Sequence, residues 1–385
     1  MKKLYGDGIH DDYPYIQKLL DSKICEVCLP TPKVCYVISK TLKIHSNQTL
    51  KLPRFATIKL ANKANCDMIE NADWETWNYN VSIEGGIWDM NHKNQRPNPF
   101  HFADEFGKKI KDYSIETGYN PKTSNTFRKN IYTGKCMRFC RVKNFTIKDI
   151  TILNPVNFGI QVAYIEDFTF KDIYFDYFDG SPKLWNMDGI HVEGNCKNGF
   201  ISNLKGACHD DLVAITADDG LYGPIDNIVI DGIYAYGAHS AVRVLSHGVP
   251  IKNLVIRNVF GSYYVYCIGL TKYHGPAEER GFMENIIIEN VFACTSEGTK
   301  DVAGGKYFIW VQKGVDVENL QIKNVCRDER TYPISTIKVD EGAFIKRFKL
   351  EDVIVKNRTG ENMQSLKIEG KVEDFEQKNI VLENL

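Results

Sequence analysis

The chain has no long apolar run and almost no net charge. No stretch in its 385 residues reaches the roughly 18 apolar residues that a membrane-spanning helix needs. A formal net charge of −1 gives no general attraction to nucleic acid or to an anionic membrane. A phosphate-cradling glycine loop, a Gly-x-Ser-x-Gly elbow and nucleic-acid motifs are also missing. These absences argue against nucleotide or serine-hydrolase chemistry and predict neither a nucleic-acid nor a membrane partner.

Cysteine occurs without a metal or disulfide pattern. The eleven cysteines are an odd number, and their two close pairs, Cys25–Cys28 and Cys136–Cys140, lack a matching second pair. We therefore expect neither a metal nor another cofactor. The start of the chain is basic but has no apolar segment, so it does not read as a secretory signal. This predicts a cytoplasmic protein, or an extracellular one if the start was trimmed.

One short phrase recurs eight times between residues 144 and 353. It pairs a leading Asn, Asp or basic residue with alternating apolar residues, and closes with Asn, Asp or Gly before a final aliphatic. Measured at that aliphatic, the steps are 23, 31, 29, 26, 32, 34 and 28 residues. A fixed phrase at this period is typical of a solenoid, in which each repeat buries its apolar face against its neighbours. The copies occupy residues 144–150, 167–173, 198–204, 227–233, 253–259, 285–291, 319–325 and 346–353.

The phrase also indicates the kind of solenoid. Apolar and polar residues alternate with period two, and β-branched and aromatic residues dominate, as in strands. The Asn, Asp or Gly near its end suits a bend, because these residues tolerate left-handed conformations. Helical repeats do not fit, and the Leu-x-x-Leu-x-Leu phrase of leucine-rich repeats is absent. We predict an all-β fold, a right-handed parallel β-helix.

Because a solenoid core grows along its axis, residues 1–385 are predicted to form a single domain. Residues 1–33 are interpreted as an N-terminal cap whose helix starts after Asp11 and Asp12, with Pro14 in its first turn. Residues 91–134 break the repeat pattern with polar, proline-containing sequence and aromatics. We predict a long loop there that lines or covers a substrate cleft.

Candidate catalytic residues fall in consecutive repeats. Asp188 precedes one strand pattern, and Asp210 and Asp211 open the next. Since adjacent strands lie about 4.8 Å apart, the three carboxyls should share one patch. Like charges this close raise the pKa of one group, which can then hold a proton near neutral pH. A protonated acid beside ionised carboxylates is what glycoside hydrolysis requires. The neighbouring Asp218–Asp219 pair is interpreted as a turn.

At these residues the sequence resembles the polygalacturonase-like glycoside hydrolases of family 28, in the pectin-lyase-like β-helix superfamily. Asn186-Met187-Asp188-Gly189-Ile190 is similar to the family's Asn-Thr-Asp-Gly motif. The segment 209–215 is similar to its Asp-Asp-Cys-Ile-Ala-Ile motif. The resemblance implies that Asp210 is the general acid and that Asp188 and Asp211 position and deprotonate water, with inversion at the sugar.

The chain departs from the family at two further motifs. His239 stands near the place of the family's Gly-His-Gly histidine, although strict alternation with Val242 shifts it by one residue. The Arg-Ile-Lys that holds a substrate carboxylate is replaced by residues 269–271, with Lys272 one residue on. We expect Arg243, pointing outward between two inward valines, to take the place of the arginine. A salt bridge from Arg243 to an Asp of a neighbouring coil is the structural alternative.

Two weaker candidates complete the predicted substrate site. Trp185 either stacks on a sugar ring or closes its coil. His247 follows an outward strand position, where a histidine usually makes ordinary surface hydrogen bonds.

The sequence therefore predicts a metal-independent, inverting glycosidase acting on a carbohydrate, with a uronic acid as one option for the sugar. A β-elimination lyase remains an alternative, with Lys272 or Arg243 as base and Ca²⁺ held by the three aspartates. A non-catalytic, tailspike-like solenoid that binds glycans is the other. The sequence leaves the oligomeric state open.

Overall fold

The computed structural model describes residues 4–96, 98, 132, 134–177, 186–273, 276, 278–298 and 307–385. They form two compact units. One comprises Met1–His191 with Cys208–Asp210, and the other comprises Val192–Ala207 with Asp211–Leu385. Each unit is a stack of parallel strands belonging to a right-handed parallel β-helix, which confirms the predicted fold. The single-domain interpretation of residues 1–385 stays a prediction.

The first unit starts with helix α1 (Tyr13–Asp21), as predicted for the cap. Ile16 and Leu20 are fully buried, and Gln17 bonds the main chain of Lys43 in both directions. The Asp12 carboxylate does not cap the helix; it accepts the N–H of Tyr5 at 2.6 Å and so holds the segment before α1. The strands are β1 (Glu26–Cys28), β2 (Tyr36–Ile38), β3 (Leu42–Ile44), β4 (Gln48–Lys51), β5 (Thr57–Leu60), β6 (Ile69–Asn71), β7 (Asn78–Glu84), β8 (Ile87–Asp89), β9 (Met137–Lys148), β10 (Thr151–Leu153) and β11 (Ile160–Asp176).

The predicted loop 91–134 lies mostly outside the described residues. Within it the structure describes a single 3₁₀ turn, η1 (His92–Asn94), and a few flanking positions. The role predicted for this loop stays a prediction. In the part of the chain that the structure describes, no helix combines the length and apolarity needed to cross a bilayer.

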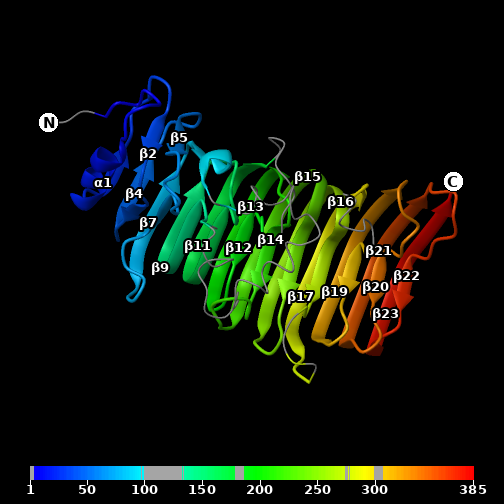
Figure 1. Cartoon of the computed structure of the whole chain (residues 1–385). Coiled ribbons are helices and arrows are strands. Elements are labelled where there is room, and N and C mark those ends of the chain that lie inside the picture. The colour runs from blue at the N-terminus through cyan, green and yellow to red at the C-terminus, as the bar shows by residue number, and fades with distance from the viewer. Residues whose placement is uncertain are drawn as a thin grey trace. The chain divides into compact units, whose positions relative to one another are not determined.

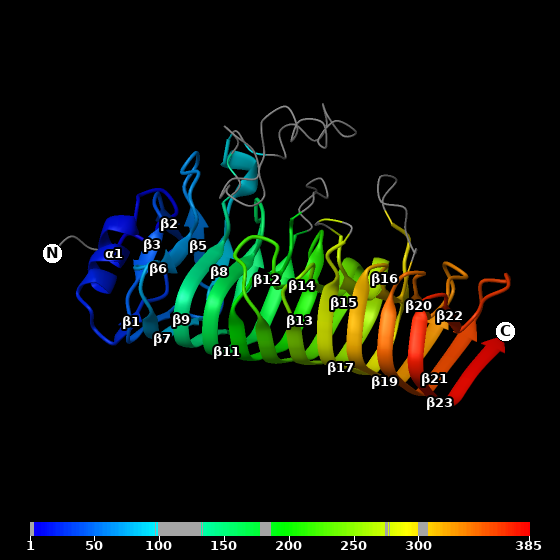
Figure 2. The same cartoon turned by 90° about the horizontal axis from the view of Figure 1, so that it is seen from below.

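The second unit contains longer strands in regular register. Figure 1 shows them side by side from green to red, and Figure 2 shows their coils from another side. β12 (Ile190–Val192) contributes residues to both units. The remaining strands are β13 (Cys196–Ala207), β14 (Asp211–Thr216), β15 (Ile225–Leu245), β16 (Ile251–Thr271), β17 (Gly281–Thr295), β18 (Ile309–Val311), β19 (Val315–Glu329), β20 (Ile337–Val339), β21 (Phe344–Asn357), β22 (Leu366–Ile368) and β23 (Lys371–Asn384).

The repeated phrase explains this register. Its inward aliphatics stack coil upon coil, so each strand completes the core of the next. One such column in the second unit is Ile201, Ile230, Ile256, Ile288, Ile322 and Leu350, all buried.

The residue before the final aliphatic of each phrase has a positive φ in all eight copies, as predicted for a bend. Asparagines at these bends also bond one another between coils: Asn324 donates to Asn290 at 2.7 Å, and Asn290 donates to Asn258 at 3.1 Å. The ladder satisfies side-chain amides that a bend would otherwise leave without partners. The eight residues are Asp149, Asp172, Asn203, Gly232, Asn258, Asn290, Asn324 and Asp352.

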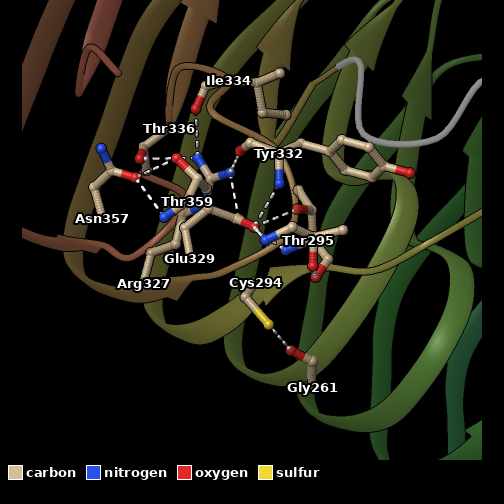
Figure 3. Close-up of polar contacts among 11 residues, drawn as sticks. Gly261, Cys294, Thr295, Arg327, Glu329, Tyr332, Ile334, Thr336, Asn357 and Thr359 are labelled. Carbon is tan, nitrogen blue, oxygen red and sulfur yellow. Dashed lines mark hydrogen bonds and ion pairs between the residues drawn. The ribbon is translucent and has the colours of Figure 1, made fainter. Parts of the chain in front are cut away.

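A buried ion pair, which we call the Arg327 cluster (Arg327, Glu329 and their partners), lies inside the second unit (Figure 3). Both charged side chains are fully buried, and Nε of Arg327 donates to Glu329 at 2.8 Å. The guanidinium also lies 4.6 Å from the ring of Phe308 and donates to Thr336 Oγ1 at 3.2 Å. The Glu329 carboxylate accepts the N–H and hydroxyl of Thr295.

Burial shifts the pKa of Arg327 downward. Burial also acts to raise the pKa of Glu329, but the Arg327 charge and the Thr295 hydrogen bonds outweigh it, and the net pKa is lowered. The carboxylate is therefore held in its ionised form opposite the guanidinium.

Candidate active site

Asp188 and His191 form a buried pair at the start of β12. The Asp188 side chain is fully buried, and its Oδ2 lies 2.6 Å from Nδ1 of His191. The imidazole stacks on Phe158, with ring centroids 4.1 Å apart. The hydroxyl of Tyr177 donates to the main-chain oxygen of Asp188 at 3.0 Å. Side chain and backbone together fix the orientation of this carboxyl.

Asp210 is the least buried of the three candidate carboxylates. Its Oδ2 accepts the main-chain N–H of Asn186 at 2.7 Å, and Asn186 has a left-handed φ of 60°. The preceding His209 is buried, with Nε2 2.7 Å from the oxygen of Tyr177. The first unit thus brings Asp210 onto the loop that carries Asp188, as the two motifs suggested.

Asp211 is the first residue of β14 in the second unit and is surrounded by polar side chains. It is fully buried; Tyr266 donates its hydroxyl to Oδ1 at 2.8 Å, and Nε of Arg243 lies 2.8 Å from Oδ2. A ring nitrogen of His239 lies within 4.8 Å of a carboxylate oxygen. A guanidinium and a phenol hydroxyl both favour the ionised form of a carboxylate. How far Asp211 lies from Asp188 stays a prediction, because the two belong to different units.

Strand register explains why these side chains meet. Asp211 pairs with Ser240 on β15, and Ser240 pairs with Tyr266 on β16. The predicted shift of His239 by one residue rests on the assumption of strict alternation along the strand. That assumption is wrong here: Ser240, Ala241 and Val242 are all buried, and the pairing of β15 with β16 is irregular just before them. His239 is therefore half-buried, edge-on to the ring of Tyr266 at 6.3 Å.

Arg243 projects from β15 between the buried Val242 and Val244, as predicted. Its guanidinium contacts acidic side chains of its own unit: Nε lies 2.8 Å from Asp211 and an Nη lies 3.8 Å from Asp219. The structural alternative of a salt bridge is thus present. A direct role in substrate binding stays a prediction.

His247 lies in a buried turn. Its main-chain N–H donates to Asp218 at 2.9 Å, and Asp218 also accepts the N–H of Val249 at 3.0 Å. The imidazole lies 3.7 Å from Glu279. Burial raises the pKa of Asp218, although the two N–H groups offset part of that rise. Asp218 therefore organises a turn, as the sequence indicated, and His247 is part of that turn rather than an open surface residue.

The other two predicted substrate residues are less informative. Lys272 is buried and donates from Nζ to the oxygen of Pro276 at 2.6 Å, while its N–H donates to Gln312. Trp185 lies outside the described residues. Within either unit taken alone, the described residues bring no three His, Cys, Asp or Glu ligand atoms together as a metal ion would require.

Two residues at the site were missed from the sequence. Neither His191 nor Tyr266 was among the candidates. The signal for Tyr266 was available, because the repeat step of 26 residues between the fourth and fifth phrases also separates Ser240 from Tyr266. For His191, its place three residues after Asp188 gave no reason to expect a contact in a strand.

Residues 117–240 match the model of glycosyl hydrolases family 28. The resemblance suggested by the motifs is confirmed. The exopolygalacturonase of Platanus acerifolia is 32% identical over 123 residues, which cover 30% of this chain and 30% of that protein. The polygalacturonase of Brassica napus is 31% identical over 129 residues, again 30% of that protein. The chain thus matches less than a third of the length of these curated relatives.

Solved structures extend the likeness to the whole chain. A hyperthermoactive exopolygalacturonase from Thermotoga maritima has a TM-score of 0.62 at 17% identity, covering 98% of this chain and 89% of its own. At such identity the likeness shows the fold alone.

Proposed function

We propose that this protein is a glycoside hydrolase that cleaves a uronic-acid-containing polysaccharide with inversion. The observation that carries the proposal is the position of the four catalytic candidates, Asp188, Asp210, Asp211 and His239. All fall inside the segment that matches family 28. The polygalacturonases among its relatives support an acidic polysaccharide as substrate.

The contacts of each carboxyl support distinct roles. Asp210 is the most accessible of the three, so it can reach a glycosidic oxygen and protonate it as general acid. Asp211, beside Arg243 and Tyr266, is suited to act as a base that takes a proton from water. Asp188, fixed by His191, orients that water. An inverting reaction uses one acid and one base on opposite faces of the sugar.

The test compares the wild-type protein with Asp210→Asn on polygalacturonate and on neutral polysaccharides. Wild type should release reducing ends from polygalacturonate, and the first product should have the inverted anomeric configuration by NMR. Asn keeps the shape of the side chain but removes its acidic proton, so turnover should fall about 10²–10⁴-fold. Circular dichroism should show an unchanged fold.

Other outcomes identify the alternatives. An unsaturated product with ultraviolet absorbance, formed only with Ca²⁺, would indicate the lyase. Binding of glycans without any cleavage would indicate a non-catalytic solenoid. If Asp210→Asn kept about half or more of the wild-type rate, Asp210 would not be the acid.

A further inference from the structure

Tyr266 on β16 reaches Asp211 on β14 across the strand β15 that pairs with both. Its ring is buried, its hydroxyl donates to Asp211 Oδ1 at 2.8 Å, and Ser240 lies between the two residues in the strand register. On the same strand, Tyr263 donates its hydroxyl to the main-chain oxygen of Phe260 at 3.0 Å. The two tyrosines thus bury similar rings, but the Tyr263 hydroxyl donates to a main-chain oxygen and the Tyr266 hydroxyl donates to a candidate catalytic carboxylate.

Gly269 makes room for this ring. A Cβ at position 269 would lie 3.1 Å from Cε2 and 3.3 Å from Cδ2 of Tyr266, closer than side chains usually approach. Any larger side chain there would push the ring that carries the hydroxyl. Position 269 is also where the resemblance places the first residue of the Arg-Ile-Lys motif. An arginine at that position would require the Tyr266 ring to shift by a few tenths of an ångström from its observed place.

A guanidinium nevertheless reaches the same neighbourhood. Arg243 pairs with Gly269 in the register of β15 and β16, so it projects beside the position that has no side chain. Its Nε lies 2.8 Å from Oδ2 of Asp211. Among the described residues, the charged or titratable groups facing Asp211 include Arg243 and His239 from β15 and Tyr266 from β16, with Asp210 as its neighbour in the chain.

We propose that Tyr266 is a positioning residue that holds Asp211 as an oriented anion, and that Gly269 is required because it admits the Tyr266 ring. The importance of this positioning for catalysis rests on the proposed function, in which Asp211 is the base. The hydrogen bond stabilises the carboxylate over the carboxylic acid, because a protonated Oδ1 is a poorer acceptor. Arg243 and Tyr266 approach the two different oxygens of Asp211, so together they fix its rotation.

The test measures the titration of Asp211 directly. Protein labelled with ¹³C at aspartate carboxyls is titrated by NMR, and the Asp211 signal is assigned by its loss in Asp211→Asn. Tyr266→Phe keeps the ring and removes the hydroxyl, so the titration midpoint of Asp211 should rise by about one pH unit. Tyr263→Phe is the matched control and should leave that midpoint unchanged.

A second variant and the rate complete the test. Gly269→Ala should shift the midpoint in the same direction by displacing the ring. In Tyr266→Phe, kcat should fall about tenfold, with the acidic limb of the pH profile moved to higher pH. An unchanged Asp211 midpoint in a folded Tyr266→Phe protein would overturn the proposal. A shifted midpoint in a protein that cleaves no polysaccharide would uphold the positioning of Asp211 and refute the proposed hydrolase.

Discussion

The second unit contains two buried arginine–carboxylate pairs with different surroundings. In the Arg327 cluster both side chains have no exposed surface, and the remaining polar atoms bond the main chain and threonines. At Asp211 the carboxylate is equally buried, but the Arg243 side chain is 12% exposed and His239 is half-buried. The same ion pair is enclosed in one place and reaches solvent in the other.

The comparison separates stability from chemistry. A fully enclosed pair can contribute only through the fold, because no substrate reaches it. A pair with one accessible member can exchange a protein partner for a substrate group. We therefore expect substitutions in the Arg327 cluster to act on the free energy of unfolding, and substitutions around Asp211 to act mainly on turnover.

The largest effect is expected from Glu329→Gln, which leaves the buried Arg327 guanidinium without a counter-charge. Breaking a buried pair in this way should lower the free energy of unfolding by about 3–5 kcal/mol. Denaturant unfolding followed by circular dichroism measures it. The control is Glu318→Gln, which removes a partly exposed partner of Lys346 and Arg347 and should change stability far less. Equal losses in the two variants would contradict the assignment of the Arg327 cluster to stability.

Asp211→Asn should act mainly on turnover and less on stability. The loss of the proposed base should lower kcat by about 10²–10⁴-fold. Stability should fall less than in Glu329→Gln, because Arg243 retains Asp219 at 3.8 Å and some contact with solvent. Rates on polygalacturonate and denaturant unfolding of the same sample give both values. A variant with a normal rate and a large loss of stability would place Asp211 with the Arg327 cluster.

Arg243→Ala separates two roles for this arginine. If Arg243 holds a substrate carboxylate, KM should rise about tenfold; if it acts through Asp211, kcat should fall instead. The melting temperature should change little. Arg257→Ala is the control, because Arg257 is a partly exposed arginine on the adjacent strand that pairs with Asp231 instead. A large drop in melting temperature with normal kinetics would show that Arg243 supports only the fold.

The smallest effect is a dependence of stability on pH. The folded-state pKa of Glu329 lies below its ordinary value of 4.5, so the folded protein binds this proton less readily than the unfolded chain. The stability from Glu329 is therefore fully present above pH 4.5 and is lost as the pH falls through the lowered pKa. Unfolding free energies measured from neutral pH downward should decline below 4.5 in wild type, and this part of the decline should be absent in Glu329→Gln.

Much of the fold followed from local sequence. The repeated phrase carries its strand period, its inward aliphatics and its left-handed bend residue within seven or eight positions, so the coil could be read without distant information. The cap helix was predicted for the same reason. The contacts of the Asp12 carboxylate with Tyr5 and Gly6 were not predicted, because a contact that reaches back before the helix has no local signature.

The site was predictable only in part. Asp188, Asp210 and Asp211 stand in short motifs that are visible in the sequence. The spacing of the repeated phrases predicts that these motifs lie on consecutive coils. The partners of those aspartates depend on register. The irregular pairing of β15 with β16 decides which side of the strand His239 faces. The alternation of residues within one strand does not reveal that irregularity.

The sequence by itself determined a solenoid of parallel strands with aspartates on consecutive coils, because each repeat contains its own folding pattern. The tertiary structure decided what those aspartates contact. Tyr266 and Arg243 reach Asp211 from strands that are distant in the chain, and Gly269 admits the Tyr266 ring. Such contacts depend on how side chains of neighbouring coils share a small volume, which is a property of packing between strands rather than of any one of them.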